Sequence, residues 1–69
     1  MIVKNNLEDI RLEMKIKTQK EFAEKVLDMR QEAYSRMANQ GQQTTLARAL
    51  YIAKKLNRPV EDIFYIASE

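Results

Sequence analysis

Residues 18–43 read TQKEFAEKVLDMRQEAYSRMANQGQQ, and this stretch decides the fold because it predicts two short helices joined by a tight turn. Thr18 followed by Glu21 is a capping-box signature, in which the two residues satisfy free N–H groups at the start of a helix. A first helix is therefore expected at residues 19–27. The periodicity of the apolar residues that follow predicts a second helix at residues 30–40.

The second of these helices has one apolar face and one polar face. At about 100° per residue, the apolar arc holds Ala33, Tyr34, Met37 and Ala38. The other half-turn, here called the polar strip, holds Gln31, Glu32, Ser35, Arg36, Asn39 and Gln40. Solvated helix faces are usually rich in Lys and Glu, whereas this strip is mostly amide, hydroxyl and guanidinium groups. Those are the groups that read base edges in DNA.

The composition excludes most kinds of active site. The chain contains no Cys and no His, so it has no disulfide, thiolate nucleophile or catalytic imidazole, and it lacks the usual zinc ligands. Its ten acidic residues are spread along the sequence and mostly stand at helical spacing from Lys or Arg. We therefore expect no catalytic residue, no metal ligand, no cofactor and no small-molecule ligand. The chain is not predicted to be an enzyme.

The sequence predicts one domain over residues 1–69. No apolar run approaches the ~18 residues of a membrane span, and the first six residues, MIVKNN, are too short for a signal peptide. The expected protein is soluble and cytoplasmic and has no membrane partner.

The expected fold is all-α, a compact five-helix bundle that contains a helix-turn-helix. The chain is 45% hydrophobic and 32% charged, with a single Gly and a single Pro. The helices are expected at about residues 6–14, 19–27, 30–40, 45–56 and 59–65. In the fourth helix, the core-facing residues are expected to be Leu46, Ala49, Leu50, Ala53 and Leu56. Tyr65 and Ile66 follow the last helix and are either a dimer contact or a frayed end.

Positive charge is concentrated around the polar strip. The formal net charge is only +2, which by itself is a weak indication of a nucleic-acid partner. Residues 30–58, however, carry six basic side chains and one acidic side chain, whereas residues 1–29 carry equal numbers of the two. The last eleven residues carry three acidic side chains and no basic one. The positive potential therefore belongs to the segment that holds the polar strip.

Two helices joined by a short turn can place the second helix in the major groove of DNA while the first crosses the backbone. The candidate base-reading residues are Gln31, Glu32, Ser35 and Arg36. The candidate backbone-binding residues are Gln19, Arg30, Gln42, Gln43 and Thr44. Simple solvation stays open for both sets. Arg30 could equally pair with Asp28 or Glu24, and the polar loop at residues 42–44 could simply be hydrated.

The sequence resembles the XRE family of helix-turn-helix regulators, the Cro and phage-repressor type. The resemblance rests on residues 18–41, with TQKEFAEK at their start, and on ALYIAKKL from residue 49 with VEDIF from residue 60. It covers about residues 5–65, nearly the whole chain. It implies a five-helix bundle that binds an operator, commonly as a homodimer.

The chain departs from the family pattern at three places. Leu27 and Asp28 occupy the turn where the family usually has Gly, with one extra residue. The loop at residues 15–17 is also one residue longer and lacks the family's Gly, and Ala38 stands where the family often has Glu. With the extra turn residue allowed for, the family's base-reading positions match Gln31, Glu32, Ser35 and Arg36. Arg30 then matches a helix-start position, and Gln19 matches the phosphate-binding glutamine.

The sequence therefore predicts a sequence-specific DNA-binding transcriptional regulator, a repressor in the style of phages or mobile elements. It would read a double-stranded DNA operator through the major groove with the helix at residues 30–40, and a homodimer is a possible assembly. One alternative is a protein-interaction module on the same fold, an antirepressor or antitoxin-like partner binder that does not bind DNA. The low net charge and the position of Glu32 within the polar strip favour that alternative.

Overall fold

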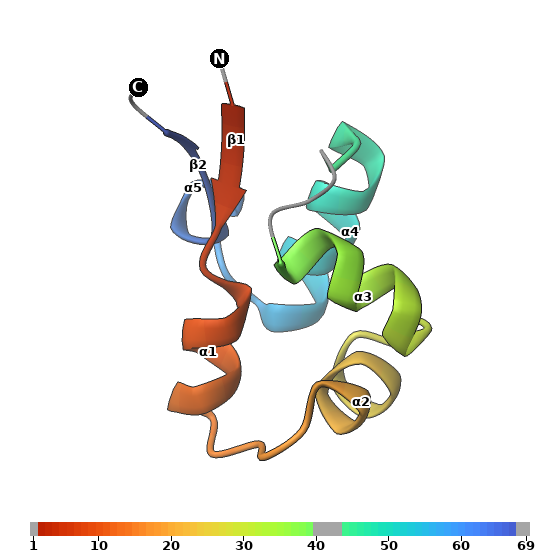
Figure 1. Ribbon diagram of the computed structural model, residues 1–69. Helices are drawn as coiled ribbons and strands as arrows, with labels where there is room; N and C mark the ends of the chain where they lie inside the picture. Colours follow the sequence, from red (N-terminus) through yellow and green to blue (C-terminus); the bar gives the residue numbers. More distant parts are fainter. Residues whose placement is uncertain (1, 40–43, 68–69) are drawn as a thin grey trace.

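The computed structural model describes residues 2–39 and 44–67. In chain order, the elements are β1 (Ile2–Asn5), α1 (Leu7–Glu13), α2 (Gln19–Glu21), the π-helical segment η1 (Phe22–Val26), α3 (Gln31–Ala38), α4 (Leu46–Leu56), α5 (Val60–Ile63) and β2 (Phe64–Ala67). Figure 1 shows β1 and β2 side by side at one end of the molecule, with α2 at the opposite end and α3 between them.

The prediction of an all-α fold is wrong, because residues 2–5 and 64–67 form a two-stranded antiparallel sheet. The register pairs Ile2 with Ala67, Val3 with Ile66, Lys4 with Tyr65 and Asn5 with Phe64. Most of these residues are β-branched or aromatic, and such side chains fit a pleated, half-buried surface. The fold is therefore mixed α/β.

The prediction of a fifth helix at residues 59–65 also needs correction, because part of that range belongs to the sheet. That helix is a single turn, α5, which ends at Ile63, and the backbone becomes extended at Phe64 with φ −114° and ψ 140°. The other expected helices are present, but each is shorter than predicted. The helix expected at 30–40 is α3, and residue 40 lies outside the described residues.

Side-chain caps hold two of the helix starts in place. The hydroxyl of Thr18 accepts the N–H of Glu21 at 3.1 Å, as the capping box predicts. The hydroxyl of Thr45 accepts the N–H of Arg48 at 3.2 Å and begins α4 in the same way. α4 ends at Asn57, which has the left-handed φ of 56° that favours Asn or Gly at this position.

The helix expected at residues 19–27 changes from α-helical to π-helical geometry along its length. The α-helical part ends at Glu21, and within η1 the N–H of Leu27 donates to the carbonyl of Phe22, five residues back, at 3.0 Å. One residue added to an α-helix produces this wider turn. Asp28 follows with φ 53°, a left-handed conformation that Asp tolerates better than most residues. Asp28 thus takes the backbone conformation for which glycine is usually chosen.

The hydrophobic core lies where α1, η1, α3, α4 and α5 meet. Its largest fully buried side chains are Tyr34, Phe22, Leu7, Leu27, Ile52 and Ile63. The rings of Phe22 and Tyr34 meet edge to face with centroids 5.5 Å apart, a favourable aromatic arrangement. The prediction that Leu46 and Leu50 face the core is wrong, because their side chains are 73% and 53% exposed. Ile52, which is not among the residues expected to face the core, is fully buried, so α4 is rotated from the predicted phase.

In the described part of the chain, every helix is too short and too polar to cross a lipid bilayer.

Candidate nucleic-acid interface

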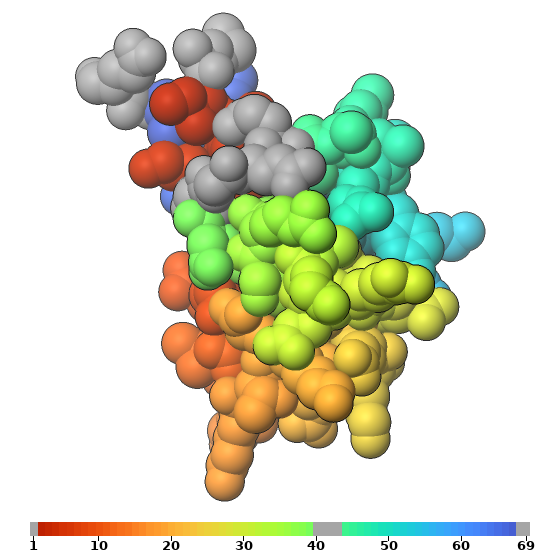
Figure 2. All heavy atoms as spheres, turned by 45° about the vertical axis from the view of Figure 1, so that its right-hand side comes forward, coloured from red at the N-terminus to blue at the C-terminus, as the bar shows by residue number. Residues whose placement is uncertain are grey.

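The candidate interface is the exposed face of α3, supported by α2. The predicted phase of α3 is confirmed for its inner face, since Tyr34 and Met37 are 0% and 4% exposed and Ala38 is also buried. The side chains of Gln31, Glu32 and Arg36 are exposed on the other face. Figure 2 shows α3 in the centre of one face of the molecule, with the atoms of α2 and η1 below it.

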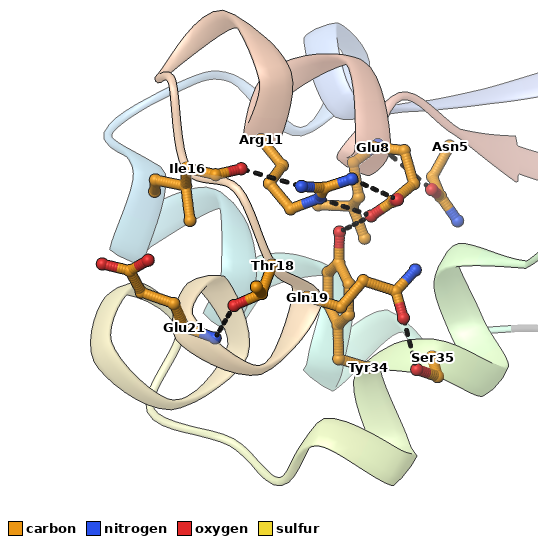
Figure 3. A network of polar contacts seen from close by, with 10 residues as sticks. Asn5, Glu8, Arg11, Ile16, Thr18, Gln19, Glu21, Tyr34 and Ser35 are labelled. Atoms are coloured by element: carbon orange, nitrogen blue, oxygen red, sulfur yellow. Dashed lines mark hydrogen bonds and ion pairs between the residues drawn. The ribbon is translucent and has the colours of Figure 1, made fainter.

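Ser35, the fourth candidate base-reading residue, is held against α2. Its hydroxyl donates a hydrogen bond of 2.6 Å to Oε1 of Gln19, the first residue of α2, and both side chains are half-buried. The structure therefore brings Gln19 beside the polar strip, as a shared DNA-binding surface would require. It also means that the Ser35 hydroxyl already has a partner, as Figure 3 shows. The side chains of the other three candidate base-reading residues are exposed.

The other candidate backbone-binding residues lie in different surroundings. Arg30 is exposed, and its carbonyl accepts the N–H of Tyr34 at 3.1 Å at the start of α3. Within residues 2–39 and 44–67, its guanidinium forms no ion pair with Asp28 or Glu24. Thr44 is half-buried and lines a groove between α4 and β2. Gln42 and Gln43 lie outside the described residues.

A network of charged and polar side chains behind α3 fixes its position relative to α1 (Figure 3). Arg11 donates from Nε and Nη2 to the two carboxylate oxygens of Glu8, at 3.2 and 3.0 Å. The hydroxyl of Tyr34 donates to the same carboxylate. Arg11 also donates from Nη1 to the carbonyl of Ile16 at 2.7 Å and so anchors the loop before α2. One carboxylate thus joins α1, the following loop and the candidate reading helix.

The two acidic groups of the network have shifted pKa values. Burial raises the pKa of Glu8, but hydrogen bonds from Arg11 and Tyr34, together with the Gln19 amide and the charge of Arg11, outweigh burial and lower it below its ordinary value. Burial raises the pKa of Tyr34, and the hydrogen bond to Glu8 and the negative charge of that residue raise it further. At neutral pH Glu8 is therefore ionised and Tyr34 is protonated, which are the forms that the hydrogen bond between them requires.

The end of α3 is held by the N-terminal strand. The side-chain amide of Asn5 donates to the carbonyl of Met37 at 2.9 Å in a buried position. Its side-chain oxygen accepts the N–H of Leu7 at 3.1 Å and thereby supports the start of α1. The middle and the C-terminal end of the candidate reading helix are thus connected to parts of the chain that lie far away in sequence.

Sequence reasoning missed the supporting roles of Glu8 and Arg11, the hydrogen bond of the Tyr34 hydroxyl and the contact of Asn5 with Met37. Glu8 fits a capping box with Asn5, yet its carboxylate binds Arg11 and Tyr34 instead. The spacing of three residues between Glu8 and Arg11 predicts an ion pair on one helix face. No pattern in the sequence, however, indicates that a tyrosine 26 residues away completes it.

The described residues contain no group of three or more His, Cys, Asp or Glu side chains that could hold a metal ion. Their buried side-chain N and O atoms all have hydrogen-bond partners. The chemistry that the exposed face of α3 offers is therefore hydrogen bonding and charge. Gln31 and Arg36 are donors on a rigid helix, and Glu32 is an acceptor beside them.

No protein-family model matches the chain, and no curated protein matches it significantly.

Proposed function

We propose that this protein is a sequence-specific DNA-binding transcriptional regulator that acts in the cytoplasm by occupying an operator. The observation that carries the proposal is the exposed face of α3, where Gln31, Glu32 and Arg36 stand on a helix whose other side is buried. The resemblance to the XRE family supports the same function. In this proposal α3 enters the major groove, and α2 crosses the DNA backbone.

The roles of the exposed residues follow from their chemistry. Arg36 can donate two hydrogen bonds to guanine, Gln31 can donate to and accept from adenine, and Glu32 can accept from the amino group of cytosine. Gln19 would bind phosphate at the start of α2, where Lys17 and Lys20 on either side of it are exposed. Glu32 also has a selective effect, because its charge repels any approach that brings a phosphate against it.

The proposal is tested by fluorescence anisotropy with a random duplex and with a duplex selected from random DNA for binding. Binding should weaken steeply between two salt concentrations, because phosphate contacts release counterions. Arg36→Ala and Gln31→Ala should each cost about 1–3 kcal/mol on the selected duplex and much less on the random one. Lys54→Ala removes one exposed positive charge on α4 and is the matched control. Equal losses on both duplexes would contradict the base-reading role.

A protein-interaction module without DNA binding is the second candidate, and the specific observation in its favour is an exposed apolar groove between α4, α5 and β2. An antirepressor or an antitoxin-like protein would bind its partner through such a surface. Failure of the wild-type protein to bind any duplex at low salt would select this candidate over the first.

A further inference from the structure

The molecule has an apolar groove at the end opposite to α2, where α4, α5 and the two strands meet. Its volume is about 710 Å³, within the roughly 300–1,000 Å³ of sites that enclose a whole small ligand. Glu61 is the only charged residue of the described lining, and most of the lining is the apolar surface of Val3, Leu46, Ala49, Val60, Phe64 and Ile66. We propose that this groove, with Glu61 beside it, binds a segment of another protein that combines apolar side chains with a Lys or Arg.

The margin of the groove is strongly exposed. The side chain of Leu46 is 73% exposed and that of Ile66 is 62% exposed, and Leu50, one turn further along α4, is 53% exposed. Single apolar residues on a surface are common, but apolar residues gathered around a groove are typical of an interaction site. A small molecule that filled only the hollow would leave most of Leu46 and Ile66 in water. A chain segment that lies across the groove covers both of them, so the exposure favours a segment of protein as the occupant.

The charge beside the groove favours a basic partner. Glu61 is exposed, and its carboxylate forms no ion pair within residues 2–39 and 44–67. Arg58, three residues earlier, is engaged elsewhere, because its Nη2 donates to Oε1 of Glu13 on α1 at 2.6 Å. Residues 59–67 contain Glu61 and Asp62 but no Lys or Arg. A Lys or Arg that follows the apolar side chains of a partner into this place would therefore meet a carboxylate that the chain itself leaves without a counter-charge.

The same charges argue against other occupants. The described lining offers no cation for a DNA phosphate or for an anionic lipid headgroup. A second copy joined through the same face would bring another Glu61 and no cation, because a two-fold interface sets the same patch against itself. Both carboxylates would then stay without a complement. A different protein with a basic side chain is the occupant that supplies it.

The position of the groove keeps this second surface apart from α2. Figure 1 shows the two strands at one end of the molecule and α2 at the opposite end, so a partner seated in the groove leaves α2 uncovered. The inference goes beyond the proposed DNA binding and does not depend on it, because every residue that carries it lies in β1, α4, α5 or β2.

The test is a selection from a random peptide library displayed on phage, with the full chain immobilised and without DNA. The enriched peptides should combine apolar residues with at least one Lys or Arg, and fluorescence anisotropy then measures their affinity. Leu46→Gln should weaken binding at least about tenfold, because it removes an apolar anchor without adding a charge. Leu12→Gln is the matched control, because Leu12 is 61% exposed on α1 and lies outside the groove.

The charge is tested by its own variants. Glu61→Gln should weaken binding of the enriched peptides about threefold, and Glu61→Lys about tenfold or more, since the second change turns attraction into repulsion. A new selection against Glu61→Lys should enrich peptides that carry Asp or Glu instead. Glu24→Lys makes the same change of charge at an exposed position of η1, outside the groove, and should leave the preference for Lys and Arg unchanged. Circular dichroism checks that each variant is folded.

A selection that enriches no peptide would overturn the inference, and so would peptides that Leu46→Gln binds as tightly as the wild type does. A charge preference that Glu61→Lys leaves unchanged would also overturn it. Sedimentation of the wild type at twice its 8.1 kDa mass, with Leu46→Gln at the mass of one chain, would show that a second copy occupies the groove instead. A protein that binds these peptides but no duplex would refute only the proposed function, so the two failures are distinguishable.

Discussion

The hydroxyl of Ser35 donates a 2.6 Å hydrogen bond to Oε1 of Gln19, and this bond joins the first residue of α2 to the middle of α3. The oxygen of the Gln19 amide is therefore turned toward α3, and the orientation of the whole amide is set by the candidate reading helix. In the proposed complex, a base-reading helix and a backbone-binding residue would move as one unit.

Ser35→Ala is expected to lower the free energy of unfolding by about 0.5–1.5 kcal/mol, the usual value of one hydrogen bond. Since the Ser35 hydroxyl is bonded to Gln19, the substitution should also weaken binding to random and selected duplexes by the same factor, through the lost orientation of the Gln19 amide. A larger loss on the selected duplex would instead support the predicted base-reading role of Ser35. Urea denaturation and anisotropy measure the two effects. Arg36→Ala is the control for stability, since this exposed residue should change the free energy of unfolding by less than about 0.5 kcal/mol. Equal stability of Ser35→Ala and the wild type would show that the bond is not maintained in solution.

Tyr34→Phe is expected to cost about 1.5–3 kcal/mol of stability, because it removes a hydrogen bond to an ionised carboxylate. The substitution keeps the ring that packs edge to face against Phe22, so it creates no cavity. Because the chain has no Trp, the change is measured by chemical denaturation followed by circular dichroism rather than by tryptophan fluorescence. A loss below about 0.5 kcal/mol would mean that water replaces the hydroxyl without cost.

The protein should lose stability in acid through Glu8. The pKa of this carboxyl is lowered in the folded state, so its contribution is fully present above the ordinary value of 4.5 and is lost as the pH falls below it. Glu8→Gln should make the free energy of unfolding depend less on pH in acid, and it should lower that free energy at neutral pH. Urea denaturation at a series of pH values from neutral to well below 4.5 gives the comparison. Identical slopes for the two proteins would exclude Glu8 as the source.

Alkaline conditions should also lower the stability of the protein, in this case through Tyr34. Its pKa is raised in the folded state, so its contribution is complete below the ordinary value of 10.0 and declines as the pH rises above it. Ultraviolet absorbance of the tyrosinate should therefore show one of the three tyrosines ionising only with unfolding. In Tyr34→Phe this late component should be absent, whereas Tyr51→Phe, which changes an exposed tyrosine, should retain it.

Asp28→Gly is expected to stabilise the protein by a few tenths to about 1 kcal/mol. Asp28 has φ 53°, and a left-handed conformation costs a non-glycine residue roughly 1–2 kcal/mol, which glycine would not pay. The greater freedom of glycine in the unfolded chain offsets part of this gain in stability. Asp28→Ala should destabilise the turn, because alanine lacks the tolerance of aspartate for this conformation. Thermal denaturation gives the order of stability of the wild type, Asp28→Gly and Asp28→Ala. If Asp28→Ala were more stable than Asp28→Gly, the left-handed conformation of residue 28 would be contradicted.

The helix-turn-helix could be predicted from local sequence because its signals are local. The Thr18 cap and the burial of Tyr34 and Met37 follow from spacing within a few residues, and the structure agrees with both. The conformation of the turn before α3 could not be predicted, because a π-helical segment and an aspartate at positive φ leave no separate pattern in the sequence.

The sheet and the supporting network could not be predicted in the same way, because both depend on contacts between distant residues. Ile2 and Val3 read as a short apolar stretch, and only their pairing with Ile66 and Ala67 makes them a strand. The outward rotation of Leu46 could not be foreseen either, since a helical apolar stripe normally faces the core. That residue belongs to a surface that the isolated chain leaves exposed.

The pairing of β1 with β2 has a consequence for how the protein is made. β1 leaves the ribosome first of all the described elements, but its partner strand, Phe64–Ala67, is translated only after every helix. The sheet can form only once both strands are present. Closing so long a loop is slow compared with forming local helices. The helices, whose contacts are local, are therefore expected to form first, and the sheet that closes this long loop is expected to form last.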